Sequence, residues 1–237
     1  MSFFDYSNQY DYPIFFEECL VPQQTKIFRE LINKYHSYVK YVEPPQRRIK
    51  WNIYETESGN LIGGIGLSSC VLALGGRDKF IGWDMETRLK NSNSVANNYR
   101  YGLIKQNITI KNVGSMVLKL LRNEGSKLWK EKYGDELVLI ETFVKPPWKG
   151  TVYKADNWNY LGMTKGNSIQ KAPLLLWKKE DSARGKLARE NPKAAIAKYA
   201  VGNKGNESGE HYKVTKSEPK LIFVKPLVRN WKKVLND

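Results

Sequence analysis

The sequence predicts an α/β (α+β) fold in which helices flank a mixed central sheet, and three stretches of the 237 residues carry this prediction. Residues 137–140 form an apolar run with the length and composition of a strand buried on both faces. Pro146 and Pro147 then exclude both strand pairing and helix, and a short helical pattern follows. Earlier in the chain, residues 50–55 and 61–67 have the pattern of two strands joined by a Ser-Gly-Asn turn.

The charge of the chain favours an acidic partner. Lysine and arginine number 39 against 24 aspartate and glutamate, which gives a formal net charge of +15. The excess lies in residues 46–237, because the first 45 residues hold more acidic than basic side chains. An excess of this size favours nucleic acid over an anionic membrane surface.

The cysteine and histidine content excludes a disulfide framework and predicts no metal site. Cys19 and Cys70 are the only cysteines, and together with His36 and His211 they do not have the spacing of zinc ligands. We expect buried or inert thiols in a reducing compartment. No apolar stretch reaches the roughly eighteen residues of a membrane span, so a soluble cytoplasmic protein is predicted.

Residues 1–22 are expected to form an aromatic and acidic N-terminal arm, since they contain no lysine or arginine. The arm has two interpretations. It packs its aromatic side chains on the core, or it lies over a positive groove as a gate. A helix is expected from Pro22 to about Tyr41, with an apolar stripe of Ile27, Leu31, Ile32 and Tyr35.

Three glycines in the second hairpin strand, Gly63, Gly64 and Gly66, indicate either a β-bulge or the close approach of another backbone. Residues 75–100 are too polar for a core element. We expect a long ordered loop with a short helix there, and such loops are more often functional than idle.

A strand is expected over residues 101–110 and a helix over 113–123. Asn112 is the expected N-cap of this helix. Gly114 leaves room for an anion to approach the free N–H groups of its first turn. The sequence therefore offers a phosphate site at the start of the helix, although many helices begin in this way.

The stretch 138–166 contains the main chemical candidates. Glu141 comes directly after the buried run, where the strand is expected to emerge from its sheet. A short amphipathic helix is expected from near Gly150, with apolar spacing through Leu161 and with Gly162 as a left-handed C-cap.

Residues 178–219 are rich in lysine, arginine and glycine and are expected to form a basic insert before the last strand. Its first half, 181–200, has the pattern of a basic helix broken at Pro192, and its second half that of a loop. Residues 221–224 return to the sheet as the final strand. We therefore predict one domain with an N-terminal arm and an insert.

Several sequence blocks between Gly64 and Gly166 match a known family in order: GLSSCVLAL, RDKFIGWD, RLKN, VANNYRY, KYGDELVLIETFV and GTVYKADNWNYLGMTKG. Tyr35-His36 and the closing VKPLVRNW fit the same pattern. The set resembles the DruA family, the Druantia anti-phage component, whose relatives also occur fused to or beside transposases. The blocks cover about two thirds of the chain, which makes the resemblance far more specific than a short motif.

The order of buried strand, proline break, short helix and further strand resembles the last third of a GNAT-type acyltransferase core. The early Tyr-His and the helix start at Asn112 and Ser115 are similar to those of the Mom protein of phage Mu, which modifies DNA adenine. These resemblances imply a GNAT-like core of residues 23–177 and 220–237 with an acyl-CoA or related acyl donor. By the same resemblance, the residues at the donor phosphates would be Lys111, Asn112, Gly114 and Ser115.

Acyl transfer to an amine needs an oriented donor, a polarised carbonyl and a base for the amine proton. Glu141 is the first candidate base and Asp78 stands behind it. Tyr153 resembles the tyrosines that protonate the leaving thiolate in many GNAT enzymes, with simple core packing as the alternative. His36 is a candidate base or phosphate contact, although a lone histidine is more often a hydrogen-bonded structural residue.

Cations interleaved with flat side chains predict a nucleic-acid surface, because lysine and arginine neutralise phosphates while aromatic rings stack on bases. An enzyme acting on a base amine must also flip that base or use single strands. The alternative is that each tryptophan fills the core and each cation is solvated. The candidate nucleic-acid-binding residues are Arg77, Trp83, Arg88, Asn98, Arg100, Trp148, Lys149 and Lys154.

Three hypotheses follow. The first is a GNAT-like transferase that modifies DNA or another nucleic acid in a phage, anti-phage or mobile-element context. The second is a catalytically inert DNA-binding module of the DruA type, used in phage defence or transposition. The third is an ordinary small-molecule or protein acetyltransferase. The basic charge argues against it, and so does the pyrophosphate signature of GNAT enzymes, Arg/Gln-x-x-Gly-x-Gly/Ala, which is reduced here to Lys-Asn-Val-Gly-Ser at residues 111–115.

Overall fold

The computed structural model describes residues 12–36, 41–44, 47–71, 74–171, 181–191, 194, 203–205, 211–216 and 218–237. The chain divides into two compact units. The main unit combines everything up to Met163 with Leu221–Asp237, and the second unit is Thr164–Lys220. None of the helices within the described ranges is long and apolar enough to cross a membrane.

The main unit is built on a seven-stranded sheet with the order β1-β2-β3-β4-β5-β10-β6. Its strands are β1 (Ile14–Glu18), β2 (Arg48–Glu55), β3 (Leu61–Ser69), β4 (Val95–Leu103), β5 (Leu139–Val144), β6 (Asn159–Met163) and β10 (Leu221–Pro226). Neighbouring strands are antiparallel except for the parallel pair β4 and β5. The predicted mixed sheet, its first hairpin and its final strand are therefore confirmed.

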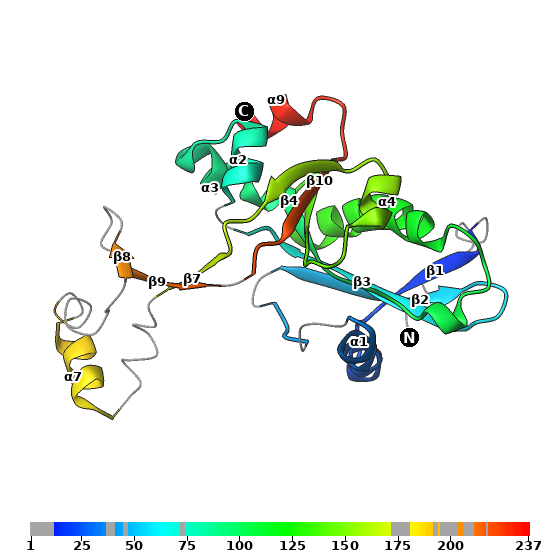
Figure 1. The fold of residues 1–237 in the computed structure, drawn as a ribbon, viewed down its shortest axis with the longest axis horizontal. Coiled ribbons are helices and arrows are strands. Elements are labelled where there is room, and N and C mark those ends of the chain that lie inside the picture. Colours follow the sequence, from blue (N-terminus) through cyan, green and yellow to red (C-terminus); the bar gives the residue numbers. More distant parts are fainter. Residues whose placement is uncertain are drawn as a thin grey trace. The chain divides into compact units, whose positions relative to one another are not determined.

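Helices lie against the sheet. They are α1 (Pro22–Tyr35), α2 (Gly75–Ile81), α3 (Met85–Asn91), α4 (Val113–Tyr133), α5 (Thr151–Ala155) and α9 (Trp231–Asn236). Figure 1 shows α1 and α4 on opposite sides of the strands β1 to β3. The glycine contacts agree, because a Cβ at Gly64 would meet Phe28 of α1, whereas Leu67, on the other face of β3, lies against Gly125 of α4. The predicted α/β class is thus confirmed.

The residues of β5 alternate between two hydrophobic clusters. Ile140 and Val144 belong to the cluster that includes α4, whereas Leu139 belongs to the cluster formed with α2 and α9. Because successive side chains of a strand point to opposite faces, Glu141 shares its face with Leu139. Thr142 faces the opposite way, toward α5.

The glycines of β3 allow close approach by parts of the same chain. A Cβ at Gly63 would lie 2.6 Å from the Gly102 carbonyl oxygen, and one at Gly66 would lie 2.5 Å from the Tyr99 ring. The β3–β4 register shifts between Gly66 and Leu67, leaving Tyr99 as the extra residue of a bulge in β4. Both interpretations of these glycines are therefore confirmed.

Several predicted boundaries are wrong. The helix expected to reach about Tyr41 is α1, which ends at Tyr35 with His36 at its C-cap. The strand expected over 101–110 is β4, which begins at Val95, because the polar side chains of its first half lie within the sheet. Residues 75–100 were expected to form a long loop with one short helix. They contain the two helices α2 and α3 and the first half of β4 instead.

Two more helix boundaries differ from the prediction. Helix α4 continues past residue 123 to Tyr133, because Gly125 packs against β3 instead of ending the helix. Helix α5 ends at Ala155, and Leu161 and Gly162 belong to β6. Gly162 has the expected positive φ of 90°, but it lies within a strand and not at a helix end.

The N-terminal arm contains β1, which pairs antiparallel with β2 and places Ile14 and Phe16 in the core. This part of the arm packs on the core, as the first interpretation expected. Residues 1–11 lie outside the described residues, so the gate interpretation stays a prediction.

The second unit contains a three-stranded antiparallel sheet with the order β7-β9-β8. Its elements are β7 (Asn167–Lys171), α7 (Ala183–Glu190), β8 (Asn203–Gly205) and β9 (His211–Lys216). The expected insert, 178–219, falls within this unit, which begins earlier because β7 pairs with β9. The expected helix is present over part of its range as α7, whereas Pro192 lies outside the described residues.

Candidate active site

The parallel strands β4 and β5 pair over only a short distance and then separate. Their register contains three pairs, from Val95↔Leu139 to Asn97↔Glu141. Beyond this point β4 continues to Leu103 and β5 to Val144. The bulge at Tyr99 lies two residues after the last pair and bends β4. The sheet is therefore open between these two strands.

A cavity of about 450 Å³ occupies this opening. Residues 98–103 of β4 and 142–144 of β5 form its walls, and the end of α1 and the start of α5 complete them. The lining includes Thr142 from the face that carries α5, and Phe143 from the face that carries α2. The cavity is thus lined from both faces of the sheet, and its volume lies in the range of small-molecule sites.

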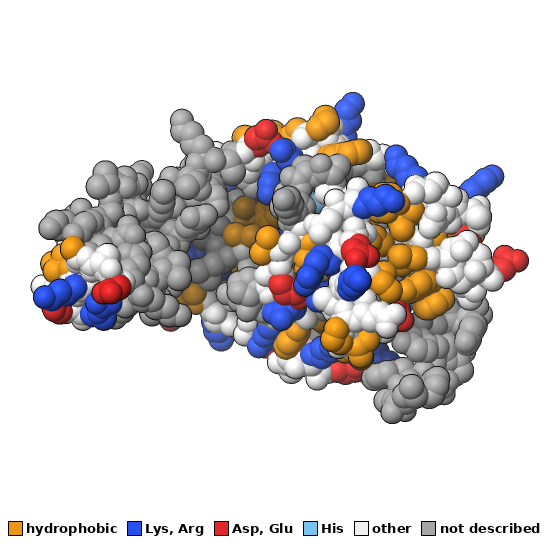
Figure 2. All heavy atoms as spheres, turned by 90° about the horizontal axis from the view of Figure 1, so that it is seen from below, with side chains coloured by type: hydrophobic (Ala, Val, Ile, Leu, Met, Phe, Trp, Pro, Cys, Tyr) orange, Lys and Arg blue, Asp and Glu red, His pale blue; other side chains and the backbone are white. Residues whose placement is uncertain are grey.

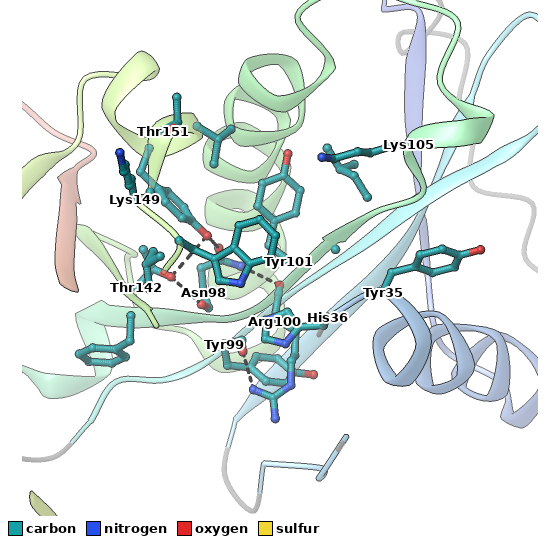
Figure 3. A pocket seen from close by; sticks show the side chains of 18 residues that line it. Tyr35, His36, Asn98, Tyr99, Arg100, Tyr101, Lys105, Thr142, Lys149 and Thr151 are labelled. Atoms are coloured by element: carbon teal, nitrogen blue, oxygen red, sulfur yellow. Dashed lines mark hydrogen bonds between the residues drawn. The ribbon is translucent and has the colours of Figure 1, made fainter. Parts of the chain in front are cut away.

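A hydrogen-bonded group of side chains lies in the wall of the cavity (Figure 3). The Tyr153 hydroxyl donates to Asn98 Oδ1 at 2.8 Å. Thr142 Oγ1 donates to the Asn98 carbonyl at 3.0 Å and lies 3.4 Å from the Tyr153 hydroxyl. The ring of Tyr153 is fixed by a stacked contact with Phe223, at 5.8 Å between ring centroids.

This arrangement places a fixed hydroxyl at the point where β4 and β5 separate. The ring of Tyr153 packs in the core, and the residue also lines the cavity, while its catalytic role stays a prediction. The side chain of Asn98 also donates to the carbonyls of Gly66 and Arg100, each at 3.0 Å. Asn98 therefore positions Tyr153. It had been predicted to contact nucleic acid, but its side chain is buried.

The lining of the cavity is positively charged. Arg100, Lys105 and Lys149 line it together with His36. No aspartate or glutamate belongs to the lining among the described residues. A cavity with this charge favours an anionic ligand.

His36 reaches the cavity from the C-cap of α1, next to Tyr35. In Figure 3, Tyr35 and His36 lie on one side of the opening, and Lys149 and Thr151 lie on the other. His36 is the histidine of the described lining, and a neutral imidazole nitrogen can accept a proton. The structure places this candidate base in the cavity, while its catalytic role stays a prediction.

Glu141 is not in the cavity, because it faces the other side of β5. Its side chain is fully buried, with Oε2 accepting from Arg77 at 2.8 Å and Oε1 accepting from the Val71 N–H at 2.8 Å. Burial raises the pKa of Glu141, and the adjacent guanidinium of Arg77 opposes this shift. The expected position at the emerging end of the strand is wrong, since β5 continues to Val144.

Asp78 belongs to the same closed cluster as Glu141. It accepts from Arg77 at 2.7 Å and from Arg88 at 3.0 Å, and a further bond of 3.1 Å joins it to the Leu74 N–H. Arg77, Asp78, Arg88 and Glu141 together form an ionic cluster. Neither carboxylate lines the cavity, so the geometry gives no support to the base role predicted for Glu141 and Asp78.

Three predicted nucleic-acid contacts are also occupied elsewhere. The Arg77 side chain is fully buried in the ionic cluster, and Arg88 is 17% exposed and paired with Asp78. Trp83 is 8% exposed, its ring lies under the Arg77 guanidinium, and its indole N–H donates to the Leu235 carbonyl. These side chains hold α2, α3 and α9 against the sheet. The prediction that Arg77 and Trp83 contact nucleic acid is therefore wrong, whereas for Arg88 it stays a prediction.

The other predicted cations and Trp148 lie near the opening. Arg100, Trp148 and Lys149 line the cavity, and Trp148 is 53% exposed. Lys154 is exposed on α5 but does not line the cavity. Figure 2 shows lysine and arginine side chains spread among hydrophobic and acidic ones on the face that it presents. They do not join into one continuous basic patch there.

The predicted phosphate residues lie at the start of α4, outside the cavity lining. Asn112 occupies the N-cap position with a φ of 59°, and its side chain makes no capping hydrogen bond. A Cβ at Gly114 would lie 2.7 Å from Val152 Cγ2. Gly114 is therefore needed for packing between α4 and α5, and the space expected for an anion is filled by Val152. Lys111 and Ser115 do not line the cavity either.

Sequence reasoning missed Thr142, Tyr101 and Lys105 as members of the cavity lining. Tyr101 donates to the Gly114 carbonyl at 3.2 Å, and burial raises its pKa well above the ordinary value. Thr142 gave a usable signal, because a polar residue adjacent to Glu141 in a buried strand must face the opposite side. Lys105 gave none, since it follows the strand in a short 3-10 turn, Lys105–Asn107.

The comparison with protein families finds one match. Residues 16–237 match the family described as Druantia protein DruA. A search of the curated proteins finds no match.

Solved structures with a similar course of the chain include three acyl-transferring proteins. FeeM, an N-acyl amino acid synthase from uncultured soil microbes, is 8% identical, with 92% of each chain covered and a TM-score of 0.46. Nourseothricin acetyltransferase is 11% identical, with 92% of this chain and 100% of that chain covered and a TM-score of 0.42. An acetyltransferase of Bacillus subtilis in complex with CoA is 9% identical, with 91% and 98% covered and a TM-score of 0.40. Because these TM-scores all lie under one half, the likenesses decide neither activity nor substrate.

Proposed function

This chain belongs to the DruA family, and we propose that it is a transferase that moves an acyl group from a thioester donor, such as an acyl-CoA, to an amine of a nucleic acid. The observation that carries the proposal is the cavity between β4 and β5, lined from both faces of the sheet, with the Tyr153 hydroxyl in its wall. Such a cavity lets donor and acceptor approach the same point from opposite sides. Holding both reactants in this way is a large part of catalysis of acyl transfer.

The residues of the cavity divide the proton transfers between them. The acceptor amine attacks the thioester carbonyl carbon, so that a carbon–nitrogen bond forms and the carbon–sulfur bond breaks. His36 takes the proton that the amine loses, and the Tyr153 hydroxyl gives a proton to the departing thiolate. Asn98 and Thr142 hold the Tyr153 hydroxyl in place for this step. Neither Glu141 nor Asp78 takes part.

The opening fits the reactive arm of an acyl-CoA. Beyond the last registered pair, Asn97↔Glu141, β4 and β5 no longer pair with each other. The edge of β4 then runs along the opening without β5 as its partner, which gives an extended arm room to lie beside it, as in strand addition. The carbonyls of Asn98 and Arg100 already accept from the side chains of Thr142 and Asn98. The phosphate end of the donor has no matching place at Gly114, because Val152 fills that position. The support for this donor therefore concerns its thioester arm only.

The nucleic-acid acceptor is supported by charge. The chain carries +15, and Arg100, Lys105 and Lys149 line the cavity with no lining carboxylate in the described part of the chain. Nucleic acid is the most common partner of a protein with such an excess of cations. A role in phage defence or in a mobile element belongs to the same proposal, through the family.

The proposal is tested by incubating the purified protein with isotopically labelled acetyl-CoA and single- or double-stranded DNA, followed by nucleoside mass spectrometry. Tyr153→Phe keeps the ring in the core and removes the proton donor. We expect a labelled nucleoside with the wild type and a yield lower by about 100-fold with Tyr153→Phe. A labelled nucleoside formed equally well by Tyr153→Phe would contradict the assigned role.

The second candidate function is a catalytically inert DNA-binding module. The same experiment distinguishes it, because such a module would bind DNA in a salt-dependent manner without any labelled nucleoside. RNA in place of DNA, and other acyl-CoA donors, are run in parallel so that the substrate is not missed.

A further inference from the structure

We propose that Trp148 and Lys149, at the mouth of the cavity, bind a nucleobase together with its phosphate. Trp148 stacks on the base and Lys149 contacts the phosphate. The inference deepens the proposed function and relies on it only for what happens inside the cavity. It places the nucleotide site at Trp148 and Lys149, called the lip of the cavity, and not at the start of α4.

The exposure of Trp148 sets it apart from the tryptophans of the core. Trp51, Trp83, Trp129 and Trp158 are 8% exposed or less, whereas Trp148 is 53% exposed and still lines the cavity. A large apolar ring is costly to leave in water. Its flat face at the entrance of a cavity that cations help to line therefore offers a stacking platform for a base.

The loop that carries Trp148 is fixed on the core. A Cβ at Gly150 would lie 2.4 Å from the Phe223 ring, so the backbone of Gly150 lies directly on that ring. The backbone N–H of Trp148 donates to the Lys145 carbonyl at 3.1 Å. A platform held in this way loses little conformational freedom when a ligand binds.

The charge beside the ring suits a phosphate. Lys149 and Lys105 line the cavity, and neither is in an ion pair with any described carboxylate. Other basic side chains of the main unit are paired with carboxylates, as Arg122 is with Asp156. Lys149, next to Trp148 in the chain, is thus available to an anion, and no carboxylate of the described lining repels it.

A nucleobase with a phosphate comes from one of two sources. It is the nucleotide end of a CoA-type donor, or it is a nucleotide of the nucleic-acid acceptor. The chemistry of recognition is the same in both cases, since every base has a face that stacks on an aromatic ring. The two sources are separated by the choice of ligand in a binding experiment.

The test measures binding to the folded chain of 237 residues without any turnover. The probes are adenosine bisphosphate, as the nucleotide end of CoA, and a short single-stranded oligodeoxynucleotide. The variants are Trp148→Ala, Trp148→Phe and Lys149→Ala. Their matched controls are Trp231→Phe, whose ring stacks on Phe80 away from the cavity, and Lys127→Ala on the exposed side of α4.

We expect Trp148→Ala to weaken one probe by about tenfold or more, and Trp148→Phe to retain most of the affinity. Lys149→Ala is expected to weaken the same probe and to lower its salt dependence, by about 0.7 in the log–log slope for a single strand. Both controls should bind as the wild type does. Weakened bisphosphate binding alone places the donor at the lip, and weakened oligonucleotide binding alone places the acceptor there.

The proposal is overturned if Trp148→Ala binds both probes as well as the wild type does, or if neither probe binds the wild type. These failures are distinguishable from failure of the proposed function. Loss of binding in Trp148→Ala, together with no labelled nucleoside from the wild type, would leave the lip as a nucleotide site without acyl transfer. Unchanged binding in Trp148→Ala with continued transfer would leave the transferase without this site.

Discussion

The ionic cluster and the cavity are two regions that take neighbouring side chains of the same strand, β5. Glu141 enters the ionic cluster, where its carboxylate oxygens accept from Arg77 and the Val71 N–H. Thr142, the next residue, turns to the cavity wall with Tyr153. The cluster satisfies itself within the protein, whereas the cavity presents Arg100, Lys105 and Lys149 to a ligand.

The difference teaches that a buried charge is not by itself a sign of catalysis. Burial raises the pKa of Glu141, as is common for catalytic acids and bases, but the side chain has no open space beside it. A catalytic group must lie within hydrogen-bond reach of its substrate. On this criterion the ionic cluster is structural: it fixes α2 and the preceding segment to β5, beside the last β4–β5 pair. The catalytic groups are then those of the cavity.

The largest expected effect lies in the stability of the ionic cluster. Arg77→Ala leaves Glu141 buried without its partner, and we expect the free energy of unfolding to fall by about 3–5 kcal/mol. Denaturant unfolding followed by circular dichroism measures this change. The matched double variant Arg77→Met with Glu141→Leu removes both charges and is expected to recover most of the loss. If Arg77→Ala is as stable as the wild type, the ionic cluster does not stabilise the fold.

The next effect separates chemistry from stability in the cavity. Tyr153→Phe removes one hydrogen bond and is expected to cost about 1 kcal/mol of stability. Its turnover is expected to fall by about 100-fold, because the leaving thiolate loses its proton donor. Stability and transfer are measured on one preparation, with Thr142→Val as the companion variant. A loss of stability as large as that of Arg77→Ala would place Tyr153 with the structural residues.

A smaller effect tests whether Gly114 packs or binds an anion. Gly114→Ala puts a methyl group 2.7 Å from Val152 Cγ2, and we expect about 1–3 kcal/mol of destabilisation in denaturant unfolding. Val152→Ala added to this variant should restore part of the stability, since it opens the space again. If Gly114→Ala instead weakens donor binding with no change in stability, the start of α4 is the anion site after all.

The smallest effect uses Cys70 as a reporter of the ionic cluster. Burial and then the negative charge of Glu141 raise the pKa of the Cys70 thiol to about 12, while Arg77 lowers it. Thiolate, and with it alkylation by iodoacetamide, therefore increases as the pH rises toward that value. Glu141→Gln removes the charge that raises the pKa, so alkylation should become faster, by about tenfold for each unit of fall.

The alkylation measurement uses a Cys19→Ser background, because burial also raises the pKa of Cys19 to about 12. Circular dichroism confirms that each variant remains folded before it is alkylated. Slower alkylation in Glu141→Gln than in its parent would contradict the electrostatic link between Glu141 and Cys70.

Much of the main unit follows from local patterns in the sequence. The apolar run at residues 137–140, the first hairpin and the final strand each have a period or a turn that predicts them, and the structure contains all three. The start of α4 at Val113 is also as expected. These features depend on residues adjacent in the chain, and adjacent residues are what such patterns describe.

The site was less accessible to sequence reasoning because it depends on which strands are neighbours. The parallel pair β4 and β5 joins residues more than forty positions apart, and only this pairing and the bulge at Tyr99 create the opening. Arg77 and Trp83 looked like a nucleic-acid surface because their partners, Glu141 and Leu235, are distant in the chain. Tyr153, Asn98, Trp148 and Lys149 were found, although the cavity that joins them was not.

The most direct test of the account compares the ionic cluster with the cavity in one transfer assay. Labelled acetyl-CoA and DNA are incubated with the wild type, with Tyr153→Phe, and with the double variant Arg77→Met and Glu141→Leu, and the labelled nucleosides are measured by mass spectrometry. We predict that the double variant, once shown to be folded, transfers label nearly as well as the wild type, while Tyr153→Phe transfers about 100-fold less. A double variant that is folded but inactive, beside an active Tyr153→Phe, would contradict the account and return Glu141 to the centre of the chemistry.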